Sequence, residues 1–269
     1  MKKGDLIFLS ASVPYRKEWT EGVRPSQIEE FVVNVARAVF SRGGRLLFGG
    51  HPSISPLVAS IASEYYKIDP QRKVRPVVTF QSELFRGQLP DETWDMYRLG
   101  FSSIIWRPDK GSKESSLTTM RSAMLGGWSA EEQSEHDLSP PRAMLTIGGM
   151  EGILEETAIF LRQRRKWPNG DRTPIYLSES SAGASQRLLE PMKNWDQRLW
   201  IGTPPGENDR RELYLAGQSQ SLLSVEREWA RVYQVPDFKA REYLPYASIA
   251  QWFVDSLDAP EALLGEDAR

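Results

Sequence analysis

The sequence predicts an α/β protein with a Rossmann-like, mostly parallel sheet covered by helices on both faces, plus C-terminal helices. Two observations predict this class. Short apolar runs that fit buried strands alternate with segments of helical periodicity along the first 190 residues. Parallel strands need helical crossovers, so this alternation indicates a layered parallel sheet. The 269 residues give ample room for a hydrophobic core.

The first expected strand, 5–12, is apolar and ends in small polar residues. Apolar positions at helical spacing predict a helix over 25–44, which Ser26 can cap and two glycines can end. The next elements in order are a buried strand at 45–50, a helix at 55–67, strands at 74–83 and 102–108, and a helix at 115–127 that ends at glycines. The polar, acidic stretch 128–142 predicts an exposed loop.

A strand at 143–149, a helix at 151–165 and a strand at 173–180 complete the expected core, residues 1–190. The remaining residues, 191–269, predict a helical extension packed on the core or at an oligomer contact. In it, 221–234 and 246–258 have helical character, and a Pro/Gly loop at 202–209 precedes them. The last residues, 259–269, predict a loose tail. We find no internal repeats.

Composition narrows the function classes. Lys plus Arg total 34 and Asp plus Glu total 36, so no global attraction to nucleic acid or anionic membrane is expected. The absence of cysteine excludes disulfides, thiolate nucleophiles and Cys-ligated metals, and favours a reducing cytoplasm. With only His51 and His136, a His-rich metal site is not expected either. The N-terminal apolar run is too short for a signal peptide, and no run approaches the roughly 20 apolar residues that span a bilayer.

Three small-residue turns follow predicted strands, at 10–16, 49–55 and 148–152. In an open parallel sheet, ligands bind beyond the carboxyl ends of the strands. Glycine permits close backbone approach, and a helix N-terminus favours phosphate. The hydroxyls available there belong to Ser10, Ser12, Ser53 and Ser55. The alternative is that the glycines only make tight turns. The glycine fingerprint of dinucleotide binding is absent after the first strand, which argues against an ordinary NAD-dependent dehydrogenase.

The segments "RLLFGGHPSISPLV", "MRSAM" and "IGGMEGILEE", taken in order, resemble the SLOG superfamily. This superfamily includes the lonely-guy phosphoribohydrolases and nucleotide-sensing domains. The resemblance covers roughly residues 5–185. The residues that carry it are Gly49, Gly50, Arg121 before Met124, Gly148, Gly149, Gly152 and Glu156.

This chain departs from the enzyme motif at three places. Ile147 replaces a proline, Ile153 replaces a threonine whose hydroxyl helps to hold phosphate, and Glu151 stands as an extra acidic residue. These departures argue against the interpretation of the chain as a phosphoribohydrolase. The resemblance then favours a sensor that binds a nucleotide-derived messenger, such as an ADP-ribose-like, cyclic ADP-ribose-like or NAD-related molecule. Several sensor members of the superfamily are linked to bacterial antiviral defence.

The alternative from a different class is an enzyme that cleaves the N-glycosidic bond of a nucleoside 5′-monophosphate. In that reading, Glu156 and Arg121 are the catalytic pair. A scaffold with a vestigial site is a third reading. No cofactor is expected. The expected partners are a nucleotide-type small molecule, an effector protein encoded separately and further copies of the chain.

Only one of the two adjacent acids is expected to point inward: Glu156 is expected to face the site and accept bonds from ribose hydroxyls, whereas Glu155 fits a first-turn acid favoured by the helix dipole just as well. Arg121 can pair with phosphate, or it can be a solvated helix arginine. Ser181, Gly183 and Ser185 are expected to border the ligand, and His136 is expected to have no role. The expected ligand-binding set is Ser10, Ser12, Arg16, Gly49, Gly50, His51, Ser53, Arg121, Gly148, Gly149, Glu151, Gly152 and Glu156.

Overall fold

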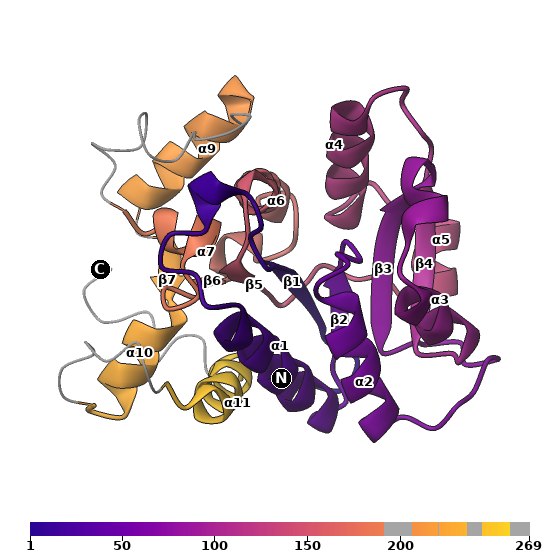
Figure 1. The fold of residues 1–269 in the computed structure, drawn as a ribbon, viewed down its shortest axis with the longest axis horizontal. Helices are drawn as coiled ribbons and strands as arrows, with labels where there is room; N and C mark the ends of the chain where they lie inside the picture. Colours follow the sequence, from indigo (N-terminus) through magenta and orange to yellow (C-terminus); the bar gives the residue numbers. More distant parts are fainter. Residues whose placement is uncertain (191–205, 220, 236–243, 259–269) are drawn as a thin grey trace.

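The computed structural model describes residues 1–190, 206–219, 221–235 and 244–258, and its central feature is a parallel sheet (Figure 1). The strands in the described residues are β1 (Leu6–Ser12), β2 (Arg45–Phe48), β3 (Val77–Ser82), β4 (Ser102–Arg107), β5 (Ala143–Gly148), β6 (Ile175–Leu177) and β7 (Leu222–Ser224). They pair in the order β4-β3-β2-β1-β5-β6-β7, and every pairing is parallel. The predicted fold class is confirmed.

The strand order reverses between β1 and β5. The chain moves outward from β1 through β2 and β3 to β4, and then returns to place β5 on the other side of β1. The pairing register sets Ser10 beside Thr146 and Ser12 beside Gly148. In doubly wound sheets, the crevice beyond such a reversal is where ligands bind. The first and third small-residue turns therefore leave the sheet side by side.

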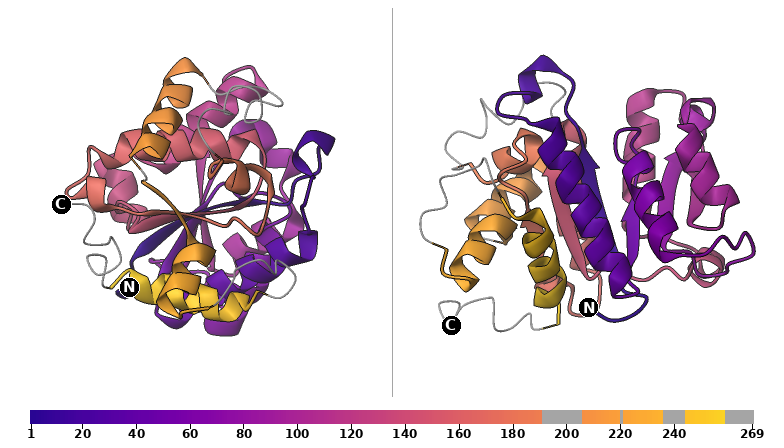
Figure 2. Two further views of the ribbon diagram at one scale, coloured as in Figure 1. Left: turned by 90° about the vertical axis from the view of Figure 1, so that its left-hand side faces the viewer. Right: turned by 60° about the horizontal axis from the view of Figure 1, so that its bottom comes forward.

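Helices cover both faces of this sheet (Figures 1 and 2). The α-helices are α1 (Pro25–Ser41), α2 (Ser55–Tyr65), α3 (Asp91–Arg98), α4 (Lys113–Met124), α5 (Ala130–His136), α6 (Glu151–Arg164), α7 (Gly183–Arg187), α9 (Glu207–Gln218), α10 (Val225–Val232) and α11 (Tyr246–Ser256). The short 3₁₀ helices are η1 (Lys17–Trp19), η2 (Glu83–Gln88) and η3 (Gly170–Arg172).

Alternate residues of β1 point to opposite faces of the sheet and pack into two hydrophobic cores. Ile7 and Leu9 pack with α1, α2, α10 and α11 on one face. Leu6 and Phe8 pack with α4, α6, α7 and α9 on the other, where the Phe8 ring stacks on Phe160 at 6.1 Å between centroids. Each fully buried side chain of this size contributes about 1.5–3 kcal/mol. The sheet is therefore held from both sides, as an all-parallel sheet requires.

The structure corrects the loop expected at 128–142, because part of it forms α5. The Ser129 side chain accepts from the Glu132 amide while Glu132 accepts from the Ser129 amide, which makes a capping box. Arg45 is only 3% exposed and donates to the carbonyls of His136 and Asp137, at 2.7 and 2.6 Å. A cap and a buried arginine thus stabilise a helix that has no buried residues of its own.

Other differences are smaller. η2 and α3 lie between the strands predicted at 74–83 and 102–108, where no element was predicted. Residues 222–224 add strand β7 to the sheet before α10 begins, where a helix was expected from 221. α9 begins at Glu207, inside the loop expected at 202–209. The expected tail, 259–269, lies outside the described residues.

The division into a core, 1–190, and an extension, 191–269, stays a prediction. The described part of the extension supplies an edge strand and three helices to the same layered body (Figure 2). Across the residues that the structure describes, no helix has the length and apolar character needed to cross a bilayer.

Candidate functional site

The turn after β5 lies at the strand reversal and requires its glycines. Gly148 and Gly149 have φ of +64° and +79°, in the left-handed region. A Cβ on Gly148 would lie 2.5 Å from Ile28 Cδ1 and 2.8 Å from the Ser12 carbonyl oxygen. The Gly149 amide donates to that same carbonyl at 2.9 Å. The turn is thus pressed against the end of β1, where no side chain fits.

The turn after β2 is built in a similar way. Gly50 has φ of +64°, and a Cβ there would lie 2.8 Å from Thr79 Cγ2. The Gln81 amide group donates to the Gly49 carbonyl at 2.8 Å and holds the turn beside β3. Gln81 was not singled out from the sequence. A polar residue near the carboxyl end of a buried strand was the signal that could have found it.

His51 and Ser53 connect this second turn to the loop after β1. His51 Nδ1 lies 2.9 Å from the Ser53 hydroxyl, which accepts from the Val13 amide at 3.1 Å. Burial, and after it the charge of Arg121, lowers the pKa of His51 from 6.5 to about 4. The imidazole is therefore neutral near pH 7, and it offers a hydrogen-bonding ring rather than a cation.

Arg121 on α4 lies between two carboxylates of α6. Its guanidinium donates to Glu155 Oε2, and its Nε lies 3.5 Å from Glu156 Oε1. The Thr118 hydroxyl, one turn earlier on α4, donates to Glu155 Oε1 at 2.6 Å. Both acidic side chains contact Arg121, which corrects the expectation that only one of them points inward.

Ser10 completes this cluster from β1, because its hydroxyl donates to Glu156 Oε2. Ser10, Arg121 and Glu156 come from three elements that converge near the strand reversal. The side chains of Arg121 and Glu156 are 16% and 14% exposed, so neither is completely enclosed. We name Ser10, Thr118, Arg121, Glu155 and Glu156 the carboxylate cluster.

Gly152 leaves space for the Arg121 side chain beside α6. A Cβ on Gly152 would lie 2.5 Å from a terminal nitrogen of Arg121. Any larger residue would push the guanidinium away from α6 and its carboxylates. Gly152 therefore makes room for Arg121, whereas the sequence predicted only that it contributes to a ligand-binding turn.

The surroundings of Glu156 raise its pKa above the ordinary value of a glutamate. Burial raises the pKa of Glu156, while the Arg121 charge and the Ser10 hydrogen bond offset part of that rise and the Glu155 charge adds to it. One guanidinium faces two carboxylates, so full ionisation leaves a net negative charge in a largely buried place. This arrangement suits hydrogen bonding to polar groups such as ribose hydroxyls.

The N-terminus of α6 already holds an anion. Glu151, the first residue of α6, forms an ion pair with Arg16 from the loop after β1. Arg16 also donates to Met150 Sδ at 3.4 Å and lies 3.9 Å from Glu18. A carboxylate at this end of a helix is favoured by the helix dipole, as a phosphate would be. Glu151 therefore competes with any phosphate for the N-terminus of α6.

Ser181, Gly183 and Ser185 pack against the β5 strand and turn. The Ser181 hydroxyl accepts from the Gly148 amide at 2.7 Å, and Ser185 and Thr146 share a hydrogen bond at 2.5 Å. A Cβ on Gly183 would lie 2.7 Å from the Gly149 carbonyl oxygen. The geometry gives these three residues a part in shaping the turn.

The remaining candidates lie apart from the cluster. Ser12 meets the β5 turn through its backbone. The buried Ser55 hydroxyl at the start of α2 has no hydrogen-bond partner among the described residues. His136, expected to have no role, lies at the end of α5, where its carbonyl accepts from Arg45. The described residues hold no group of three side chains able to bind a metal.

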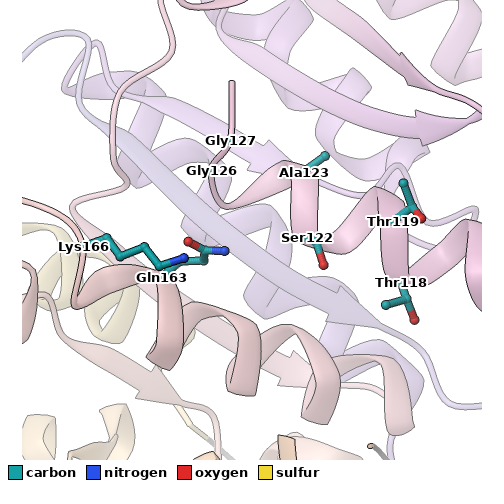
Figure 3. A pocket seen from close by; sticks show the side chains of 8 residues that line it. All are labelled: Thr118, Thr119, Ser122, Ala123, Gly126, Gly127, Gln163 and Lys166. Atoms are coloured by element: carbon teal, nitrogen blue, oxygen red, sulfur yellow. The ribbon is translucent and has the colours of Figure 1, made fainter. Parts of the chain in front are cut away.

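A cavity of about 620 Å³ lies along the adjoining faces of α4 and α6 (Figure 3). It is lined by Thr118, Thr119, Ser122, Ala123, Gly126, Gly127, Gln163 and Lys166. Thr118 belongs both to this lining and to the carboxylate cluster. The cavity therefore extends from the cluster along the helices, away from the glycine turns.

Together, the sheet order and the glycine turns define a Rossmann-like α/β protein with a cluster of polar side chains near its strand reversal. The chain belongs to the SLOG cluster3 family, whose model matches residues 19–200. Membership supports a nucleotide-related function. No curated protein matches the chain. The X-ray structure of TM1055, a structural genomics target, is similar at 13% identity and a TM-score of 0.44, over 87% of this chain and all of that one.

Proposed function

We propose that this protein binds a nucleotide-derived signalling molecule of the ADP-ribose, cyclic ADP-ribose or NAD-related class, and acts as a sensor. The observation that carries the proposal is the convergence of Ser10, Arg121 and Glu156 at the strand reversal. A hydroxyl, a guanidinium and a carboxylate are the groups that recognise ribose hydroxyls and phosphate oxygens. The glycine turns lie at the carboxyl ends of the strands beside this cluster and keep large side chains away from the same crevice.

Glu151 supports an intact, larger ligand over a nucleoside 5′-monophosphate. Its carboxylate and Arg16 occupy the start of α6, where a terminal phosphate would gain most from the helix dipole. A monophosphate would have to displace this ion pair and would meet like charge. A ligand whose phosphates are internal can reach Arg121 and the glycine turns without a dianion at that helix end.

Hydrolysis of an N-glycosidic bond is the second candidate, and one observation favours it. Burial raises the pKa of Glu156, and a raised pKa is the direction that suits a general acid toward a leaving base. Arg121 would then orient the ribose phosphate. In this scheme the base leaves with the proton from Glu156 as its bond to the anomeric carbon breaks, one water adds to that carbon, and the water gives up a proton to the Glu156 carboxylate.

A sensor needs an output, so the proposal includes an effector protein encoded separately, assembly into a homo-oligomer, and a place in a bacterial defence or stress response. We propose the cytoplasm as its location, since the chain has no cysteine. The family and the site support a nucleotide-type ligand, and these further roles extend that proposal.

Equilibrium dialysis against AMP, NAD, ADP-ribose and its cyclic isomers, read by mass spectrometry, tests both candidates. Wild type is compared with Glu156→Gln, which keeps the side-chain shape. Glu131→Gln, an exposed position on α5, is the control. We expect wild type and the control to retain an ADP-ribose or NAD-related ligand intact, and Glu156→Gln to retain at least tenfold less, roughly the worth of a charged hydrogen bond.

Two results would contradict the sensor proposal. Free base released from AMP by wild type, and lost in Glu156→Gln, would establish the hydrolase instead. Equal retention of the ligand by wild type and Glu156→Gln would show that Glu156 does not contribute to ligand binding. Thermal unfolding of each variant shows whether a loss of binding reflects a loss of fold.

A further inference from the structure

A buried carboxylate on α10 accepts hydrogen bonds from the loop that follows β6. Glu226 is fully buried, and its Oε1 accepts from the hydroxyls of Ser178 and Ser180 at 2.6 and 2.8 Å. Its Oε2 accepts from the Glu179 amide at 3.0 Å. A carboxylate with this many donors is well satisfied, whereas one without them would be costly to bury.

The same loop holds the Gly148 turn through a short relay. The Ser181 hydroxyl donates to the Ser178 carbonyl at 2.9 Å and accepts from the Gly148 amide at 2.7 Å. The Ala184 amide donates to the Gly149 carbonyl at 2.9 Å. Hydrogen bonds therefore run from α10, through the loop, to both glycines of the turn after β5.

The loop after β6 contains two residues with positive φ, a conformation that needs support from the surrounding structure. Ala182 has φ of +55° and ψ of −150°, a region that residues with a side chain rarely adopt, and Gly183 follows with φ of +59°. Such conformations cost about 1–3 kcal/mol and persist when the surroundings impose them. The contacts of Glu226 lie two to four residues before Ala182, at the start of the strained segment.

Tyr246, the first residue of α11, contacts both the loop after β6 and helix α1. Its hydroxyl lies 3.0 Å from the Ser180 hydroxyl, and its ring stacks on Phe31 of α1 at 5.0 Å between centroids. The acid is thus enclosed by α10, α11 and the loop. Burial raises the pKa of Glu226, and the hydrogen bonds from Ser178, Glu179 and Ser180 oppose that rise.

We infer that Glu226 is a positioning residue of the ligand site, which holds the Gly148–Gly149 turn in shape through the loop after β6. The inference rests on the proposed function for its account of what the turn binds. It also gives the C-terminal helices a role, since α10 then contributes to a site that it does not itself reach.

Hydrogen exchange read by mass spectrometry tests the inference without any ligand. Glu226→Gln keeps the shape but turns one acceptor into an NH₂ group that opposes the donors around it. We expect exchange to become about tenfold faster in peptides that cover 178–184 and also in those that cover 146–150, as expected when one buried hydrogen bond is lost. Exchange over 91–107, in α3 and β4, should stay unchanged.

Glu228→Gln is the matched control, on the same helix two residues later. Glu228 is 24% exposed in its side chain and pairs with Arg231, so this variant should leave both regions at wild-type rates. If Glu226→Gln fails to fold, Ser180→Ala removes one donor to Glu226 and keeps the acid, and the same two regions should exchange faster to a smaller extent.

Faster exchange at 178–184 alone, with 146–150 unchanged, would overturn the inference, because the relay to the turn would then be absent. Unchanged exchange in both regions would overturn it too. Retention of ADP-ribose in dialysis is measured alongside. If wild type retains no nucleotide, the proposed function fails, while the exchange result still decides whether Glu226 positions the turn.

Discussion

The Ser10 hydroxyl on β1 donates a hydrogen bond to Glu156 Oε2 on α6, across 146 residues of chain. This single contact joins the first strand of the sheet to the helix that follows the strand reversal. Since Glu156 also faces Arg121, the serine helps to set the position and the ionisation of the carboxylate. The contact thus connects the stability of the fold with the chemistry of the site.

Ser10→Ala should lower the free energy of unfolding by about 1–3 kcal/mol, because a largely buried carboxyl loses a donor. Urea denaturation at pH 7 measures it. Ser12→Ala is the control, since the Ser12 side chain makes no hydrogen bond to any described residue. Equal losses in the two variants would show that the Ser10–Glu156 contact contributes nothing of its own.

Gly148→Ala should cost about 2–4 kcal/mol of stability, which combines left-handed backbone strain with the collision against Ile28 and the Ser12 carbonyl. Gly87→Ala is the comparison, because a Cβ there meets nothing within 4 Å. Thermal unfolding of both variants gives the difference. A Gly148→Ala protein as stable as Gly87→Ala would contradict the tight turn described above.

Glu151→Gln should allow phosphate to bind at the start of α6. Removing the resident carboxylate leaves Arg16 and the helix N-terminus to an external anion, and a charge at a helix end is worth about two- to fivefold in affinity. Calorimetric titration with AMP and with inorganic phosphate measures the gain. Glu18→Gln also removes an acid near Arg16 but leaves the helix end occupied, so it should gain less. No gain in Glu151→Gln would contradict competition at this position.

His51 should make stability depend on pH in a definite direction. Its folded pKa is about 4, against 6.5 for an unperturbed histidine, so the unfolded chain binds more protons between these values. Stability should therefore fall as pH falls from about 6.5 to 4, by about 3 kcal/mol from this residue. Glu156 and Glu226 act in the opposite sense, because their raised pKa values make the folded state bind protons more tightly.

Comparison of wild type with His51→Gln isolates the histidine. Urea unfolding of both proteins at pH 7, 5.5 and 4.5 gives the difference at each pH. The wild type should lose more stability than the variant toward acid. Parallel curves would show that the imidazole is accessible enough to titrate normally in the folded protein.

Much of the fold followed from local pattern. Apolar runs and helical spacing determined β1, α1, α2 and α6, because burial on a sheet or along one helix face imposes a period that a single sequence displays. The glycine turns were also visible, since a backbone that must adopt positive φ beside a neighbouring strand leaves a characteristic residue. The resemblance to the SLOG superfamily agrees with the family match.

Tertiary contacts decided the rest. α5 has no buried face, so its helix depends on a capping box and on Arg45 from a distant strand. The pairing of Arg121 with both Glu155 and Glu156 depends on the packing of α4 against α6 and on the space that Gly152 leaves for the guanidinium. No local pattern could place Glu226 beside Ser178, 48 residues earlier. A sequence shows which groups must be buried or turned, whereas the partner that each polar group meets is set only when the layers pack.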